Sequence, residues 1–218
     1  MSGTGHRLDM TMMYTFHDAL RRDLDRLARI TARADDDPRQ LLRSALGWQL
    51  FTTYLRVHHT AEDIAVWPAM TRALAGRPDD LALLDAMEAE HAAIDPLLAA
   101  VDAALADPEA GPERLAAAVD ALRTELTGHL RHEETEALAL IDATLTDQQW
   151  ADFGAEHRAR IGDDLPRYLP WVLDEVDPAT VEKVLDGMPA PIREAYRTQW
   201  RPAYADLRAW STTASTGH

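Results

Sequence analysis

The sequence predicts an all-α protein, an antiparallel up-down-up-down four-helix bundle followed by a C-terminal helical extension. Two observations carry this prediction. Hydrophobic residues make up 46% of the 218 residues and are mainly Ala and Leu, which are among the best helix formers. Apolar residues also recur at helical spacing in four long segments that are separated by short turn-forming stretches. Short loops between long helices favour antiparallel neighbours.

The four helices are predicted at about residues 11–34, 39–74, 81–105 and 113–145. They are separated by an acidic run with a proline at 35–38, a turn at 76–80, and Asp-Pro and Gly-Pro pairs at 107–112. Pro68 is expected to end or bend the second helix early. Pro96 is expected to kink the third, because proline removes a backbone donor and crowds the preceding turn.

The chain changes character after residue 145, where prolines become frequent. Thr146 has the character of an N-cap for the next helix. We therefore expect three parts: a bundle at 11–145, an extension of shorter helices at 146–210, and a flexible polar tail at 211–218. The extension is expected to pack on the bundle or on a partner subunit, so a homodimer is one expectation.

Composition narrows the classes of function. The net charge of −15 disfavours nucleic acid as a partner, because an acidic surface repels phosphate. The absence of cysteine excludes disulfides, cysteine-ligated iron–sulfur clusters and thiol nucleophiles. No targeting pattern opens the chain and no apolar run is long enough to span a membrane. We therefore expect a cytoplasmic protein without a membrane partner.

An internal repeat carries the candidate chemistry. In each half, a lone helical histidine precedes a second histidine by 41 or 38 residues, and a glutamate follows that second histidine at i+4. Because residues i and i+4 stack on one helix face, each His-x-x-x-Glu pair can aim at one point. The set suits two first-row metal ions, with bridging carboxylates and positions left open for a small ligand. Its members are His17, His58, Glu62, His91, His129 and Glu133.

The alternatives to a metal centre are weaker. One histidine on an apolar face, or one His-x-x-x-Glu pair, is commonplace in helices. Two matched His-x-x-x-Glu pairs, each preceded by a lone helical histidine, are not commonplace. Burying four histidines and two glutamates without an ion would also be costly. A ferritin-type centre needs Glu-x-x-His twice, and only Glu88 with His91 fits. The His-Glu-x-x-His pattern of zinc proteases is absent.

With these residues, the chain resembles the hemerythrin-like, or HHE cation-binding, domain family over about residues 11–145. The resemblance implies a non-haem di-iron site in which an oxo or hydroxo group bridges the ions. Such a site interacts with O2, hydrogen peroxide or nitric oxide. It also implies that the two glutamates bridge the ions and the four histidines are terminal ligands. Manganese and zinc suit the same donors. The matching segments are His17-Asp18-Ala19-Leu20, His58-His59-Thr60-Ala61-Glu62-Asp63 and His129-Leu130-Arg131-His132-Glu133-Glu134.

The sequence departs from the family on the third helix. Oxygen-carrying hemerythrins place a second histidine four residues after the first, where this chain has Asp95. The iron on that side would be poorer in nitrogen, which disfavours simple oxygen carriage. Tyr54, four residues before His58, is a candidate additional ligand because a phenolate binds ferric iron well. A core tyrosine, or a donor to a ligand carboxylate, is the alternative.

Neighbouring residues receive smaller roles. Asp63 and Glu134 are the next carboxylates round their helices and are weaker ligand candidates. His59 and His132 lie about 100° round the helix from the ligand face and are expected at the polar surface. Other histidines, His157 among them, lack a partnered pattern.

Three functions remain open for such a site. The first is a redox enzyme that disproportionates hydrogen peroxide or otherwise detoxifies oxygen and nitrogen species. The second is a module that senses or stores O2, NO or iron and signals through residues 146–210. The third is a structural role, in which the metal only stabilises the bundle. Open coordination positions favour the first two.

Overall fold

The computed structural model describes residues 5–32, 38–39, 42, 45–107, 109 and 111–210. Every regular element in these ranges is a helix, so the all-α prediction is confirmed. The predicted stop at 35–37 and the predicted flexible tail at 211–218 lie outside the described residues. None of the described helices is both long and apolar enough to cross a membrane.

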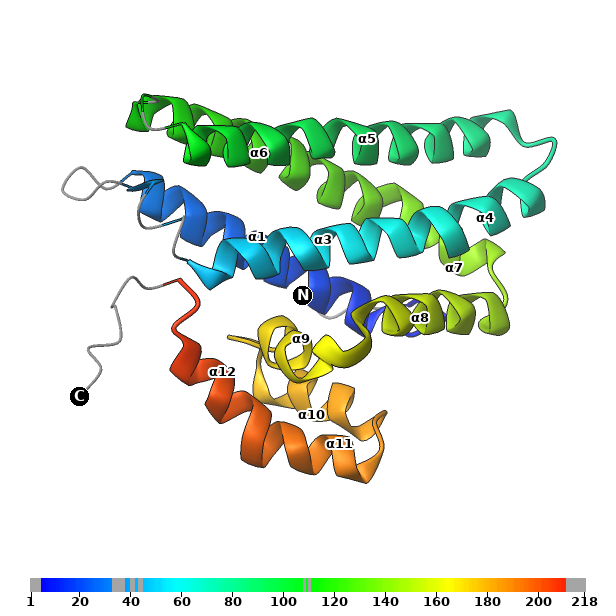
Figure 1. Ribbon diagram of the computed structural model, residues 1–218. Helices are drawn as coiled ribbons and strands as arrows, with labels where there is room; N and C mark the ends of the chain where they lie inside the picture. Colours follow the sequence, from blue (N-terminus) through cyan, green and yellow to red (C-terminus); the bar gives the residue numbers. More distant parts are fainter. Residues whose placement is uncertain are drawn as a thin grey trace.

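Four long helices lie side by side (Figure 1), and they carry every candidate ligand except Glu133. Helix α1 packs against α3 and α6, and α5 packs against the same two, so the four close into a ring. The antiparallel order stays a prediction. The bounds are Thr11–Thr31 for α1, Leu46–Ala65 for α3, Pro78–Ala106 for α5 and Pro112–His132 for α6.

The second predicted helix, at 39–74, is interrupted in the structure. Ala45 is extended, so α3 starts only at Leu46. Val66 then separates α3 from the short helix α4, Trp67–Ala73, with Pro68 in the first turn of α4. A proline is tolerated there because its missing N–H would have no helical partner. The third helix, α5, runs through Pro96 without interruption.

The fourth predicted helix, at 113–145, is not uniform. After α6 the chain makes one π-helical stretch, η1, Glu133–Ala137, and continues as α7, Leu138–Thr144. A π-helical turn has i→i+5 bonds and shifts the phase of the residues after it, and such turns occur frequently at functional sites. Here it begins on a predicted ligand, Glu133.

A polar layer divides the interior of the bundle into two apolar clusters. Along α1 and α5 the chain passes from the smaller cluster through the polar layer to the larger one, and along α3 and α6 it passes in the opposite order. The predicted ligands occupy the layer between. Members of the larger cluster include Leu20, Leu55, Ile94 and Leu126, and members of the smaller include Met13, Ala61, Met87 and Ala137.

The extension consists of short helices on one side of the bundle (Figure 1). The N-cap prediction for Thr146 is confirmed, because its side chain and that of Gln149 form a reciprocal capping box. Helix α8 packs on α3, and α9 and α10 pack on α1. The bounds are Asp147–Ile161 for α8, Leu165–Val172 for α9, Pro178–Asp186 for α10, Ala190–Ala195 for α11 and Arg201–Leu207 for α12, with η2 at Gly162–Asp164 and η3 at Tyr196–Trp200.

A buried carboxylate joins the extension to α1. Asp23 is fully buried and accepts a hydrogen bond of 2.8 Å from the Trp171 indole N–H. Arg22 and Arg26 each donate to its other oxygen at 3.0 Å. Both arginines also bind Asp174, at its carbonyl oxygen and its carboxylate respectively. These charge-assisted bonds fix α9 against the bundle.

Removing this carboxylate should destabilise the protein strongly. We expect Asp23→Ala to lower the free energy of unfolding by about 3–5 kcal/mol, because it leaves buried donors and charge without their partner. Asp25→Ala is the matched control: Asp25 pairs with Arg123 at the exposed surface, and its loss should cost less than about 1 kcal/mol. Urea unfolding followed by circular dichroism measures both, and equal losses would contradict this role for Asp23.

Candidate metal centre

All six predicted ligands are buried in the polar layer, and a seventh residue, His59, is buried with them. Five elements contribute them, so the group exists only when the bundle is assembled. Both glutamates and His17 have no exposed surface. The seven residues are His17 on α1, His58, His59 and Glu62 on α3, His91 on α5, His129 on α6, and Glu133 at the start of η1.

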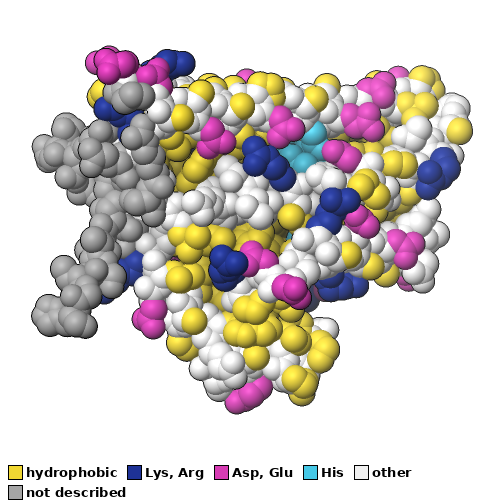
Figure 2. Space-filling model, viewed as in Figure 1, with side chains coloured by type: hydrophobic (Ala, Val, Ile, Leu, Met, Phe, Trp, Pro, Cys, Tyr) yellow, Lys and Arg dark blue, Asp and Glu magenta, His cyan; other side chains and the backbone are white. Residues whose placement is uncertain are grey.

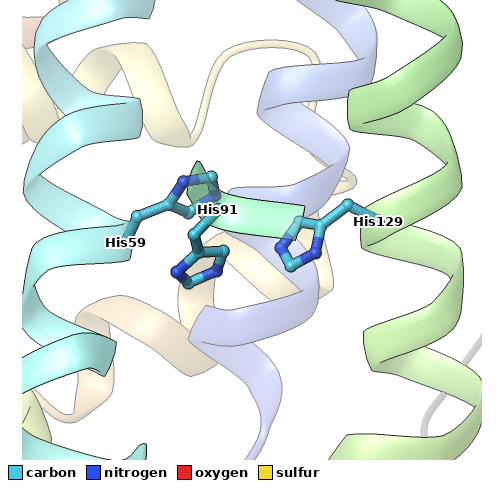
Figure 3. A group of neighbouring side chains, drawn as sticks. All are labelled: His59, His91 and His129. Carbon is cyan, nitrogen blue, oxygen red and sulfur yellow. The ribbon is translucent and has the colours of Figure 1, made fainter. Parts of the chain in front are cut away.

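The ligand atoms form two groups, and in each group they lie within 4.8 Å of one another. The first, which we call the two-histidine position, consists of His17, His58 and Glu133. The second, the three-histidine position, consists of His59, His91 and His129. Figure 3 shows the three imidazoles of the second position converging from different helices. Each group offers three ligand atoms to one ion.

The two glutamates stand between these positions. Glu62 directs Oε1 to within 3.2 Å of His58 Nε2 and Oε2 to within 3.6 Å of His91 Nε2. One oxygen of its carboxylate therefore faces each position. Glu133 Oε2 lies 3.2 Å from the Nε2 of His17 and 3.9 Å from that of His129. Both carboxylates are placed to link two ions.

Nine buried polar atoms of this group have no hydrogen-bond partner: the Nε2 of all five histidines and both oxygens of both glutamates. Leaving so many donors and acceptors unsatisfied in one place would be very costly, because each buried polar group without a partner costs free energy. Metal ions would satisfy all of them at once. Imidazole nitrogen and carboxylate oxygen together suit first-row metals, so the residues fit a pair of such ions.

Three further carboxylates hold ligand histidines from behind. Because a carboxylate only accepts, the bound Nδ1 carries a proton, and Nε2 is the nitrogen that remains for a metal. Such partners fix the orientation of the ring and raise its basicity. The pairs are His17 with Glu134, His91 with Asp63, and His129 with Glu90, each with an Nδ1–O distance of 2.9 Å.

Asp63 and Glu134 were predicted as weaker ligands, and the structure gives them this supporting role instead. Arg21 binds both oxygens of Glu134, at 2.8 and 2.9 Å. Glu90, which sequence reasoning missed, also accepts from Nδ1 of His132 at 2.8 Å. His132 is partly exposed, as expected, and Glu90 links it to the candidate ligand His129.

The charge state of the ligands follows from their burial. Burial and neighbouring imidazoles lower the pKa of His58 and His59 well below the usual value, so both are neutral. Burial and the adjacent Glu133 raise the pKa of Glu62 well above its usual value. Burial would lower the pKa of His17, but Glu133 and Glu134 outweigh it and raise the pKa to about 9. A metal must therefore displace a proton from His17, and the raised pKa of Glu62 makes this carboxylate a second group at which protons compete with a metal.

The expectation that His59 lies at the surface is wrong. Its ring stacks on His91 with centroids 3.9 Å apart, whereas His58 lies against His17 at 5.5 Å. Helix α3 lies between α1 and α5, so consecutive residues can each face one of these neighbours. The inward arc of a bundle helix is wider than the single stripe that we read from the spacing.

His59 also corrects the expectation of a nitrogen-poor iron. Asp95, which stands where oxygen-carrying hemerythrins have a histidine, is exposed and lies 3.9 Å from Arg56. The third imidazole on that side comes from α3 instead of α5. The sequence signal for His59 is its place directly after His58. A rotation of about 100° per residue, however, predicts that His59 faces away from the ligand side of the helix.

Tyr54 does not have the character of a metal ligand in this structure. Its hydroxyl donates to Asp164 of the extension at 2.5 Å, and its ring packs on Tyr168 and Trp171. Burial and Asp164 raise the pKa of Tyr54, which opposes the phenolate form that ligation needs. The residue is a core tyrosine that links α3 to the extension.

Aromatic groups cover the two-histidine position. The Phe16 ring lies 4.2 Å from that of His58, measured between centroids. From α8, Phe153 and His157 approach His58 at 6.2 and 5.7 Å. His157, for which the sequence showed no pattern, thus belongs to the surroundings of the site. His17 and His58 are buried on this side, where residues of α1 and of the extension cover His58.

The described elements are all helices, and they bring together two adjacent groups of buried side chains that could hold metal, which is the arrangement of a candidate metal-binding protein. The chain is a member of the hemerythrin family: the model of the hemerythrin HHE cation-binding domain matches residues 9–141. The resemblance drawn from the motifs is therefore confirmed. The match includes every candidate ligand and ends in α7, before the extension. No curated protein and no solved structure gives a match.

Replacing His59 tests the seventh ligand. We expect the wild-type protein to retain two first-row metal ions per chain, and His59→Ala to retain close to one after dialysis against a weak chelator. Loss of a ligand should weaken the site by more than the 10- to 100-fold or so typical of a group behind a ligand. Elemental analysis measures the content. The control is His6→Ala, because in the described part of the chain the His6 ring contacts Tyr14 and Asp142 and none of the candidate ligands. This variant should keep both ions, and two firmly held ions in His59→Ala would refute ligation.

Metal affinity should also depend on pH. The proton on His17, with a pKa of about 9, competes with the metal, so affinity should fall as pH falls below about 9. The expected change is about tenfold per pH unit for each displaced proton. Competition titrations with Zn²⁺ at several pH values check this, together with the protons released into a weak buffer. Affinity that does not change between pH 6 and 9 would contradict the proton count.

Proposed function

We propose that the protein is a non-haem di-iron protein that reacts with small oxidants, by disproportionating hydrogen peroxide or detoxifying O2 or NO. The observation that carries this proposal is the ligand set of the two-histidine position. Two imidazoles and one carboxylate on one face, with open positions opposite, are typical of iron that activates oxygen. Glu62 adds an oxygen shared with the second position.

The antiparallel order of the four helices is part of the proposal. It is supported by the alternation of the two apolar clusters, since successive long helices cross the polar layer in opposite directions. In that arrangement the two His-x-x-x-Glu pairs lie on α3 and at the junction of α6 with η1, helices that cross the layer in the same sense. The pseudo-twofold repeat of the sequence then has a structural counterpart.

Bound iron would supply a redox couple and open coordination positions for the oxidant. The chain's own residues prepare these positions. Glu134 behind His17 raises the basicity of that imidazole, which favours the higher charge of an oxidised metal. Phe16 and the extension exclude water on the same side, which strengthens every electrostatic interaction inside. The same donors accept manganese or zinc, but only a redox-active metal fits this reaction.

A second candidate function, sensing or storage of O2, NO or iron without turnover, is favoured by the contacts of the extension. His157 and Phe153 lie against His58, and Asp164 holds Tyr54 one turn before that ligand. A displacement of His58 on ligand binding would therefore be passed directly to α8 and η2. Such a coupling would be superfluous for a metal that only pins the bundle.

Peroxide turnover separates these functions. Iron-loaded protein should evolve one O2 for every two H2O2 consumed, measured with an oxygen electrode. His58→Ala should lose this activity, because it removes a ligand of the two-histidine position, and His6→Ala should keep it. Binding of peroxide or NO without turnover, with a change in Trp171 fluorescence, would favour the sensor. Failure to bind iron would contradict both.

A further inference from the structure

A pocket of about 360 Å³ opens between α3 and α5, next to the three-histidine position. His59 and His91 form part of its inner wall. Figure 2 shows a histidine side chain at the surface in this region, with acidic and basic side chains around it. We call this cavity the entry pocket. Its charged lining residues are Arg56, Asp63, Glu88 and Asp95.

The entry pocket is where the centre comes nearest to solvent. His59 and His91 are 8% and 7% exposed, whereas His17, Glu62 and Glu133 are 0% exposed. The Nε2 atoms of both wall histidines have no hydrogen-bond partner. The opposite side of the centre is covered by Phe16 and the extension. A species that reaches the ligands from water therefore has its shortest way through this pocket.

The charges at the pocket favour a cation. The pocket is lined by three carboxylates and one guanidinium. The distance from Arg56 Nε to Asp95 Oδ1 is long, at 3.9 Å, and both side chains are more than half exposed. Such an exposed pair neutralises its members weakly. Carboxylate oxygens concentrate divalent cations and can replace part of their water shell. A neutral oxidant would gain nothing from this charge, and an anion would be repelled.

We propose that the entry pocket is the route by which divalent metal ions load the centre. Asp95 and Glu88 attract the hydrated ion, and the unpartnered imidazoles of His59 and His91 then take it from the pocket. Glu62, with one oxygen facing each position, lies between the three-histidine position and the enclosed one. This inference rests on the proposed metal centre but not on any reaction of the loaded metal.

Loading can be timed with Co²⁺ alone as the probe, by stopped-flow absorbance after mixing with metal-free protein. Asp95→Asn and Glu88→Gln should each slow uptake about threefold, because each removes an attractive charge near the path. Arg56→Gln should speed uptake by a similar factor. These differences should shrink at high salt, which screens the charges. The amount of Co²⁺ bound at saturation should stay that of the wild type.

Asp120→Asn is the control for net charge, since Asp120 is an exposed acid on α6 away from the pocket. It should leave the uptake rate unchanged. A second pair of variants tests the route itself. Ala92 lines the pocket, and its exposed neighbour Ala93 does not. Ala92→Trp should obstruct the pocket and slow uptake, and Ala93→Trp should not.

Opposite effects of the acidic and basic substitutions, with slow uptake in Ala92→Trp alone, would support the route. Rates that do not respond to these variants would overturn it while leaving the metal centre intact. If Ala92→Trp slows azide binding to the iron-loaded protein but not Co²⁺ uptake, the pocket admits small ligands and the inference is wrong. A chain that binds no Co²⁺ at all would overturn the metal centre and this inference together.

Discussion

The two carboxylates of Glu62 and Glu133, buried side by side without hydrogen-bond partners, set the constraint on which the rest of the structure depends. Burial and Glu133 raise the pKa of Glu62, and the cost of burying both carboxylates is relieved by positive charge beside them, such as the proton on His17 or a bound metal ion. Five imidazoles surround them, each with an Nε2 atom that has no hydrogen-bond partner. The bundle accommodates this group as a polar layer between two apolar clusters. Metal binding should therefore contribute directly to the stability of the fold.

The surroundings make the two sides of the centre different. On one side, aromatic rings of α1 and of the extension cover the two-histidine position, and Asp23 fixes the extension there. On the other, an acidic pocket leads from solvent to the three-histidine position. Supporting carboxylates hold one histidine of the first position and two of the second. The proposed reaction would then take place at the buried two-histidine position, and metal ions would enter from solvent at the three-histidine position.

Much of this could be predicted from the sequence, because the helical period and the i,i+4 spacing are local properties. The helices, the stop near Pro68 and the six repeated candidate ligands, which the structure buries together, follow from them. Three features do not, because they depend on which helices are neighbours. His59 faces inward only because α3 lies between α1 and α5, and Glu90 serves His129 on another helix. Tyr54 meets Asp164 of the extension, a contact that spacing along one helix cannot reveal. The π turn at Glu133 likewise has no composition signal.

Anomalous diffraction at the iron edge, from crystals of the iron-loaded protein, tests the central claim most directly. We predict two peaks on opposite sides of the Glu62 carboxylate. One should be bound by His17, His58 and Glu133, and the other by His59, His91 and His129. A single peak, or a second ion without His59 among its ligands, would contradict the binuclear centre described by these residues.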